Sequence, residues 1–321
     1  MTAKAPARQA LKADGLLLLT AVIWGLSFVA LRSSMRVMGP FAFSAARFAL
    51  GTVSLLPLLA VARRRGPRAP EPGAPPRLGP RGRAAWAGFV GVILFAAANI
   101  QQVGLVTTTA GNAGFITSLF VILVPVIRFL HGKPAGLPVW SGAALAVAGL
   151  YFLSVTTGGS AGFTMARGDL LCLAAALFWT AQILLINRLV ARMEALEIAV
   201  GQFATCAVLS LAAALILEPA PFAGMRAAAV PILYSGLLSI GVAYTLQIVA
   251  QKHAHPTHAS IILAMQSLFA GLGGVILLGE PWTSRLVAGG LLMLAGMVVS
   301  QLRPELPDQA NPCQANVLKK S

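Results

Sequence analysis

A single arginine, Arg47, stands inside a long apolar stretch that runs from residue 41 to residue 62. A charged side chain at the centre of a lipid bilayer costs at least about 2.5 to 3.5 kcal/mol, so it has to face protein or water. One interpretation is that Arg47 recognises an anion or lines a cavity. The alternative is that its long side chain extends to the nearer membrane surface, because Arg47 lies only about five residues into the stretch.

Amide side chains gather in two other apolar stretches. One cluster is Asn99, Gln101 and Gln102 in residues 84–106, and the other is Tyr244, Thr245 and Gln247 in residues 227–250. Asn112, Thr117 and Ser118 repeat the pattern in residues 110–130. Amides in hydrocarbon need hydrogen-bond partners, so these side chains are expected to face the interior of a helix bundle. They contact a bound solute or, alternatively, only bind one another between helices.

Two tryptophans, Trp24 and Trp179, lie near the middle of their apolar stretches rather than at the ends, where membrane tryptophans usually lie. Ser27 and Gln182 follow them at a spacing of three residues, which places each on the same helix face as its tryptophan. This arrangement predicts the wall of a binding cavity. The alternative is that the indole rings only pack between helices.

Three closely spaced histidines, His253, His255 and His258, have the chemistry of metal ligands or proton relays. The alternative is a loop followed by a helix start, because Pro256 interrupts the group and no cysteine or carboxylate lies beside it. The three cysteines are scattered and form no metal or disulfide pattern. No carboxylate lies in the middle of an apolar stretch, although Asp169 begins one. We expect no metal, no cofactor and no catalytic residue.

The elements that must position these residues are ten apolar stretches. They cover residues 16–34, 41–62, 84–106, 110–130, 137–157, 170–187, 196–217, 227–250, 257–279 and 285–302. About 20 residues of helix cross a bilayer, and the stretches are continuously apolar rather than alternating as in a β-barrel. With 57% hydrophobic and only 10% charged residues, a soluble domain is excluded. The predicted fold is an all-α polytopic membrane protein with ten transmembrane helices, in which Pro125 bends the fourth helix.

Positive charge predicts how these helices are oriented. The chain has 24 Lys and Arg against nine Asp and Glu, a net charge of +15. With the N-terminus in the cytoplasm, eighteen basic residues lie inside and five outside, and seven of the eighteen are arginines of the loop 63–83. This bias predicts a protein of the cell (inner) membrane with both termini cytoplasmic. The loop lacks the stacking aromatics of single-strand binders, so nucleic acid is not expected as a partner.

The two halves of the chain repeat one another. An offset of 155 residues aligns Asp14 with Asp169, Trp24 with Trp179, Arg47 with Gln202 and Phe48 with Phe203. After the basic loop the offset contracts to 146 or 147 and aligns Gln101 with Gln247, Gly132 with Gly279, Pro134 with Pro281, Gly142 with Gly289 and Gly149 with Gly296. Each half holds five helices, an odd number, so the second half crosses the membrane in the opposite sense. Inverted repeats of this kind are typical of secondary transporters.

The second part of each half resembles a known family. The segments are NAGFITSLFVILVPVIRFLHGKP with WSGAALAVAGLYFL, and HASIILAMQSLFAGLGGVILLGEPW with LVAGGLLMLAGMVV. They are similar to the two EamA repeats of the drug/metabolite transporter superfamily. The resemblance implies a ten-helix permease with a central cavity, often an exporter of amino acids, metabolites or drugs. Lys133 stands where the family often has an acidic residue, and Ser267 where it often has proline.

We therefore expect the following organisation: a cytoplasmic tail 1–13, a first repeat 14–157 with its basic loop, a second repeat 168–302 and a disordered cytoplasmic tail 303–321. The expected function is transport of a small solute by alternating access, without the phosphate-binding loop of ATPases. The expected substrate contacts are Trp24, Ser27, Arg47, Asn99, Gln101, Asn112, Trp179, Gln182, Tyr244 and Gln247. The expected partners are the solute and the lipid bilayer, with a homodimer left open beside the monomer. The alternatives are a membrane scaffold or an intramembrane enzyme, for which Ser239 and a nearby histidine are the nearest nucleophile and base.

Overall fold

The computed structural model describes residues 4–64, 75–107, 110–132, 136–154, 167–254, 256–278 and 284–301, and every element in these ranges is a helix. The first half holds α1 (Lys4–Ser34), α2 (Pro40–Arg64), α3 (Pro80–Thr107), α4 (Ala110–Ser118), α5 (Phe120–Leu130) and α6 (Leu137–Ser154). The second half holds α7 (Arg167–Leu189), α8 (Ala195–Leu217), α9 (Ala229–Leu233), the π-helix η1 (Tyr234–Tyr244), α10 (Thr245–Gln251), α11 (Pro256–Ala264), α12 (Gln266–Leu278) and α13 (Ser284–Gln301). The predicted tail 303–321 lies outside the described residues.

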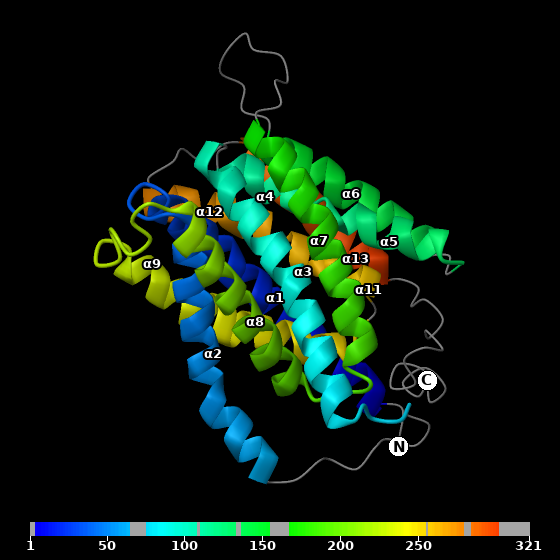
Figure 1. Cartoon of the computed structure of the whole chain (residues 1–321). Helices are drawn as coiled ribbons and strands as arrows, with labels where there is room; N and C mark the ends of the chain where they lie inside the picture. Colours follow the sequence, from blue (N-terminus) through cyan, green and yellow to red (C-terminus); the bar gives the residue numbers. More distant parts are fainter. Residues whose placement is uncertain are drawn as a thin grey trace.

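The ten predicted membrane helices are present, five in each half. Within the described residues, seven helical segments are long and apolar enough to cross a membrane, and three shorter apolar helical stretches, Ile116–Leu130, Leu137–Gly149 and Val287–Ser300, complete the ten. Large apolar side chains such as Leu56, Val208 and Leu215 point outward, as expected where the solvent is lipid. The chain is an all-α, multi-pass membrane protein, and the helices lie in one bundle (Figure 1).

Three spans differ in detail from the prediction: the first begins earlier, and the fourth and ninth are interrupted. Helix α1 begins at Lys4, so most of the predicted tail 1–13 is helical, because Pro6 is tolerated in a first turn and the following residues favour helix. Pro125, where a bend is predicted, lies inside α5, which continues as a helix through that residue. The fourth span is interrupted at Leu119, where the Leu119 N–H bonds the Ile116 carbonyl at 3.1 Å. The ninth span is interrupted at Met265, whose N–H bonds the Ile262 carbonyl at 3.1 Å, and the two interruptions are 146 residues apart, as the repeat predicts.

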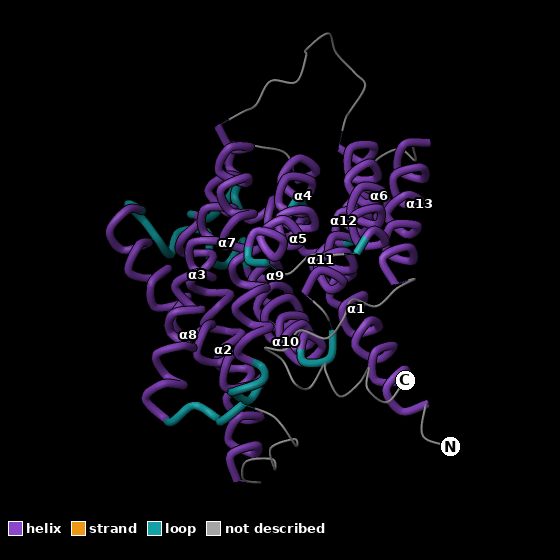
Figure 2. Tube along the Cα trace, turned by 90° about the vertical axis from the view of Figure 1, so that its right-hand side faces the viewer, coloured by secondary structure: helices purple, strands orange, loops and turns teal. Residues whose placement is uncertain are grey.

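Glycines bring the fifth and tenth spans together. Helices α6 and α13 lie side by side at one edge of the bundle (Figure 2). A Cβ atom on Gly142 would lie 2.7 Å from the Gly296 carbonyl oxygen, and one on Gly149 would lie 2.6 Å from the Gly289 carbonyl oxygen. Only glycine allows this backbone approach, and small residues drive helix association in membranes, where lipid is as apolar as leucine. These glycines therefore serve close packing of the two helices.

The two halves also meet where the second and third spans of the first half pack against the first and second spans of the second half. Helix α3 packs against α7 and α8, and α2 packs against α8. Polar contacts cross the same boundary: Glu218, after α8, accepts hydrogen bonds from the Phe41 and Ala42 N–H groups at 2.7 and 3.1 Å, which caps the start of α2. These contacts hold the halves together around a common centre.

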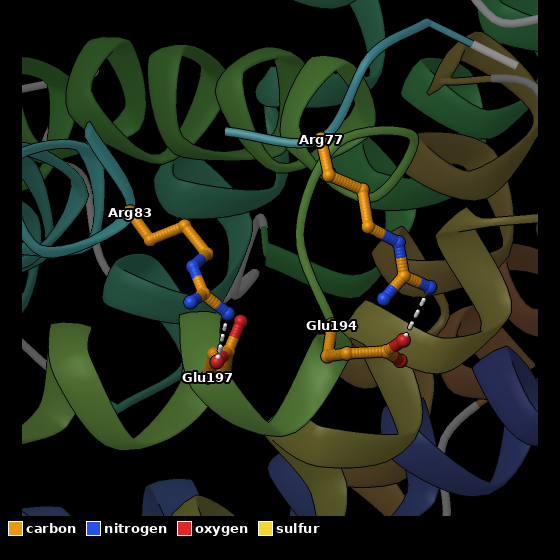
Figure 3. A network of polar contacts seen from close by, with 4 residues as sticks. All are labelled: Arg77, Arg83, Glu194 and Glu197. Carbon is orange, nitrogen blue, oxygen red and sulfur yellow. Dashed lines mark hydrogen bonds and ion pairs between the residues drawn. The ribbon is translucent and has the colours of Figure 1, made fainter. Parts of the chain in front are cut away.

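Two ion pairs join the halves near the predicted cytoplasmic side (Figure 3). Arg83 in the first turn of α3 donates to Glu197 in the first turn of α8 at 2.7 Å. Arg77, just before α3, donates to Glu194, just before α8, at 2.8 Å. Because these side chains are partly exposed, each pair contributes at most about 1 kcal/mol of stability. Their contribution is to set the register between the two helix starts.

Candidate substrate cavity

A cavity lies between the two halves near the middle of the membrane spans. The centre of a water-sized sphere can occupy about 50 Å³ of it, and its empty space, which includes open solvent at its mouth, is about 560 Å³. It is lined by Trp24, Ser27, Phe28, Leu31, Arg47, Gln101, Thr117, Phe120, Trp179, Gln182, Ile183, Ser239, Tyr244, Gln247, Leu263 and Gln266. The structure therefore brings together eight of the ten residues expected to contact substrate, namely Trp24, Ser27, Arg47, Gln101, Trp179, Gln182, Tyr244 and Gln247.

The lining is built from equivalent positions of the two repeats. The pairs are Trp24 with Trp179, Ser27 with Gln182, Phe28 with Ile183, Gln101 with Gln247, Thr117 with Leu263 and Phe120 with Gln266. The last two pairs flank the helix interruptions at Leu119 and Met265. Four lining residues have no equivalent in the lining, namely Leu31, Arg47, Ser239 and Tyr244. The equivalents of Arg47 and Tyr244 are Gln202 and Ala98. Most of the lining thus follows the repeat symmetry, whereas the charged Arg47 and the phenol of Tyr244 have no equivalent side chain in the cavity.

Aromatic rings form one wall of the cavity. The Tyr244 ring lies 4.5 Å from the Trp24 ring, centroid to centroid, and stacks on Trp179 at 5.9 Å with an interplanar angle of 25°. The Trp24 Nε1–H donates to the Ser239 carbonyl at 3.1 Å. Ser239 and Tyr244 both belong to the π-helix η1, a geometry that often marks functional sites. The π-helix and α1 together fix the position of this wall.

The two equivalent glutamines have different surroundings. Gln101 accepts a hydrogen bond from Trp179 Nε1 at 3.1 Å and donates one to Thr117 Oγ1 at 2.9 Å. Gln247 is only 1% exposed, and its Oε1 has no hydrogen-bond donor in the described part of the chain. Gln101 therefore holds the cavity wall together, whereas Gln247 presents an unsatisfied acceptor.

Arg47 does not extend to a membrane surface, because it is 6% exposed and lines the cavity. Its guanidinium carbon lies 4.9 Å from the centroid of the Phe48 ring and 5.6 Å from that of Phe43. Among the described residues it makes no ion pair, and its buried Nε–H has no acceptor. The guanidinium lies against aromatic rings and has no counter-ion in the part of the chain that the structure describes.

Gln266 is a cavity residue that sequence reasoning missed. It donates from Nε2 to Ser118 Oγ at 3.3 Å, and Ser118 in turn lies 2.7 Å from Ser267 Oγ. Ser267, where the family often has proline, also donates to the Gly114 carbonyl at 3.0 Å. These hydroxyls join the two helix interruptions across the repeat boundary. A search for amides inside apolar stretches would have found Gln266, but its repeat partner is Phe120, so the repeat alone gave no signal.

Two expected contact residues are not placed in the cavity. Asn99 donates to Ser210 Oγ at 2.9 Å and to the Phe95 carbonyl at 3.0 Å, which fastens α3 to α8. Asn99 and Gln101 are two residues apart on one helix, so they point to different sides of it. Asn112 belongs to α4, and its side chain lies outside the described part of the structure.

Within the described residues, the histidines and Ser239 are not brought together as a metal site or as a nucleophile and base. His258 Nε2 lies 3.0 Å from Asp14 Oδ1 and joins α11 to α1, whereas His255 lies outside the described residues. In the described ranges no three His, Cys, Asp or Glu side chains are grouped as metal ligands. Ser239 lines the cavity, but no hydrogen bond joins it to a histidine in the part of the chain that the structure describes.

Comparison with known proteins agrees with this architecture. The EamA-like transporter family matches the chain twice, over residues 11–155 and 166–301. A protein of Archaeoglobus fulgidus named an uncharacterized transporter is 32% identical over 295 residues, which cover 91% of this chain and 87% of that protein. One solved crystal structure matches with a TM-score of 0.70 at 21% sequence identity. The match covers 90% of this chain and 96% of the chain in that structure, and it supports the fold. The chain therefore belongs to the EamA-like transporter family and is a multi-pass membrane transporter.

Proposed function

We propose that the protein is a secondary permease, an exporter, that binds a small metabolite, amino acid or drug-like solute in the central cavity and moves it by alternating access. The observation that carries this proposal is the paired lining, in which equivalent positions of both halves surround one space. In inverted-repeat transporters, rocking of one half against the other exposes such a site to either side of the membrane. The outward direction rests on the family resemblance.

The moving parts required by this mechanism have structural counterparts. The fourth and ninth spans are interrupted at equivalent residues beside the cavity, and the eighth span is wound as a π-helix there. Helices bend most readily at such irregular turns. The sequence holds no GxxxxGK[ST] phosphate-binding loop, so the energy comes from a gradient or from exchange.

We further infer that the permease lies in the inner membrane with both termini in the cytoplasm. The excess of arginine and lysine on one side, eighteen against five, supports this orientation. On this placement the ion pairs of Arg77 and Arg83 with Glu194 and Glu197 lie on the cytoplasmic side.

Exchange in reconstituted vesicles tests the proposal. Purified protein is placed in vesicles loaded with unlabelled amino acids, carboxylates or organic cations, and entry of the matching labelled compound is measured without ATP. We expect protein-dependent exchange of at least one compound, and slower exchange when Gln247 is replaced by leucine. The proposal would be contradicted if exchange required ATP. It would also be contradicted if none of the replacements in the cavity lining changed the rate of exchange.

A further inference from the structure

We propose that the transported solute is an organic anion, a carboxylate attached to a flat apolar body, and that Arg47 binds the carboxylate. This inference rests on the proposed function, because it assigns the substrate class of the same cavity. It depends on three features: an uncompensated buried cation, an aromatic wall beside it, and the absence of acidic side chains from the described lining.

The first feature is the missing counter-ion of Arg47. A buried guanidinium is stable only when its N–H groups meet acceptors, yet the buried Nε–H has none and no carboxylate of the described residues lies within ion-pair distance. Packing of the repeat does not require a charge at this position, because the equivalent residue is the neutral Gln202, which accepts a hydrogen bond from Gln182 at 3.4 Å. The charge is therefore available to a ligand.

The surroundings of the Arg47 guanidinium show which kind of group would bind it. Phe43 and Phe48 are fully buried, and their rings lie 5.6 and 4.9 Å from the guanidinium carbon. Aromatic faces attract the cation and restrict its position, but they supply no oxygen acceptor for its planar array of donors. Two parallel N–H donors fit the two oxygens of a carboxylate better than any neutral group. A carboxylate is thus the group that the cavity lacks.

The second feature, the aromatic wall of the cavity, indicates the shape of the rest of the solute. Trp24, Tyr244 and Trp179 form a continuous aromatic wall, and Phe28 and Phe120 add further rings to the lining. Stacked or edge-on packing against such rings favours a flat apolar body. Gln247 Oε1 accepts a hydrogen bond from a polar N–H or O–H on that body, because it lacks a donor.

The third feature, the absence of acidic side chains from the described lining, predicts which charge of solute binds most tightly. The cavity lining that the structure describes contains Arg47 and no aspartate or glutamate. The ammonium group of a cation or a zwitterion would find no carboxylate there and would be repelled by Arg47. We therefore expect the order of affinity to be anion, then neutral analogue, then cation.

Binding to purified protein tests this order without any transport. The probes are phenylacetate and indole-3-acetate, their neutral amides and phenethylammonium, with phenylalanine as the zwitterion, each measured by calorimetry and by the shift in melting temperature. Both carboxylates should bind at least about tenfold more tightly than their amides, since one good charge-assisted contact is worth about 1.4 kcal/mol or more. Phenethylammonium should not bind.

Variants at Arg47 identify the source of the preference. Arg47→Met and Arg47→Gln, the second copying the repeat partner, should bring the carboxylates down to the affinity of the amides and leave the amides unchanged. Arg47→Lys should keep part of the preference, because lysine keeps the charge but not the planar fork. The control is Arg36→Met, which removes an exposed arginine outside the cavity and should change nothing. Melting of each variant without ligand shows whether it is folded.

Several results would overturn the assignment. They are equal binding of acid and amide, tighter binding of the cation or the zwitterion, no binding of either carboxylate, or a preference that survives in a folded Arg47→Met or Arg47→Gln protein. Vesicle exchange is scored separately. If phenylacetate binds through Arg47 but no compound is exchanged, the proposed transport function fails while the anion site stands.

Discussion

Gln101 and Gln247 occupy equivalent positions of the two repeats. Replacing each by leucine should change the stability of the protein in opposite directions. Gln101 joins Trp179 to Thr117 through two hydrogen bonds. Gln247 has a buried Oε1 without a donor. We predict that Gln101→Leu destabilises the protein, whereas Gln247→Leu leaves its stability unchanged or raises it. Both substitutions should reduce transport.

The magnitudes follow from these contacts. Hydrogen bonds between membrane helices contribute about 0.6 kcal/mol each, so Gln101→Leu should lower the free energy of unfolding by about 1 kcal/mol. Removing a buried acceptor that has no partner relieves a desolvation cost of about 1 to 3 kcal/mol, of which leucine recovers a part. Gln247→Leu should therefore raise the free energy of unfolding by up to about 1 kcal/mol.

The assay is unfolding in mixed detergent micelles, followed by tryptophan fluorescence, beside exchange in vesicles normalised to folded protein. The matched control is Val249→Leu, a substitution on the exposed side of the span that contains Gln247, which should alter neither measurement. The reasoning would be refuted if Gln247→Leu destabilised the protein as much as Gln101→Leu. It would also be refuted if both variants exchanged solute at the normal rate per folded molecule.

Three further predictions concern the fold. Gly142→Ala should destabilise the protein by about 1 to 3 kcal/mol, because its Cβ would meet the Gly296 carbonyl at 2.7 Å, whereas Gly15→Ala, with no atom within 4 Å, should be neutral or stabilising in the same unfolding assay. Glu218→Ala should lower the free energy of unfolding by about 1 to 2 kcal/mol, since it removes the acceptor of two N–H groups at the start of α2, and an unchanged unfolding midpoint would contradict that role. Cysteines introduced into the loop after Arg63 or the tail after Arg303 should react with an impermeant thiol reagent only from the cytoplasmic side, and labelling from outside would reverse the orientation.

The repeat made most of the cavity predictable from sequence. Trp24 with Trp179 and Gln101 with Gln247 stand at equivalent positions in otherwise apolar stretches, so the inverted symmetry places each pair around one axis. The ten helices were predictable for a related reason, because a bilayer requires continuous apolar stretches of about 20 residues.

The remaining features depend on contacts that leave no periodic trace. Asn99 and Gln101 belong to one cluster in sequence, but only the packing of α3 decides which of them meets α8 and which meets the cavity. The π-helix Tyr234–Tyr244 and the interruptions at Leu119 and Met265 lie inside the predicted apolar stretches, where the polarity pattern does not distinguish a regular α-helix from an irregular one. The interruption of the fourth span lies at Leu119, whereas Pro125, the residue that breaks helices by type, lies inside α5.

Thiol labelling of one cavity position from each side of the membrane tests the central claim most directly. Ser27 is small and lines the cavity, whereas the native Cys172 and Cys206 are fully buried, so Ser27→Cys is combined with replacement of Cys313 only. If access alternates, an impermeant reagent should label residue 27 in both right-side-out and inside-out vesicles, and labelling from either side should block exchange. Labelling from one side only, with exchange intact, would contradict alternating access through this cavity.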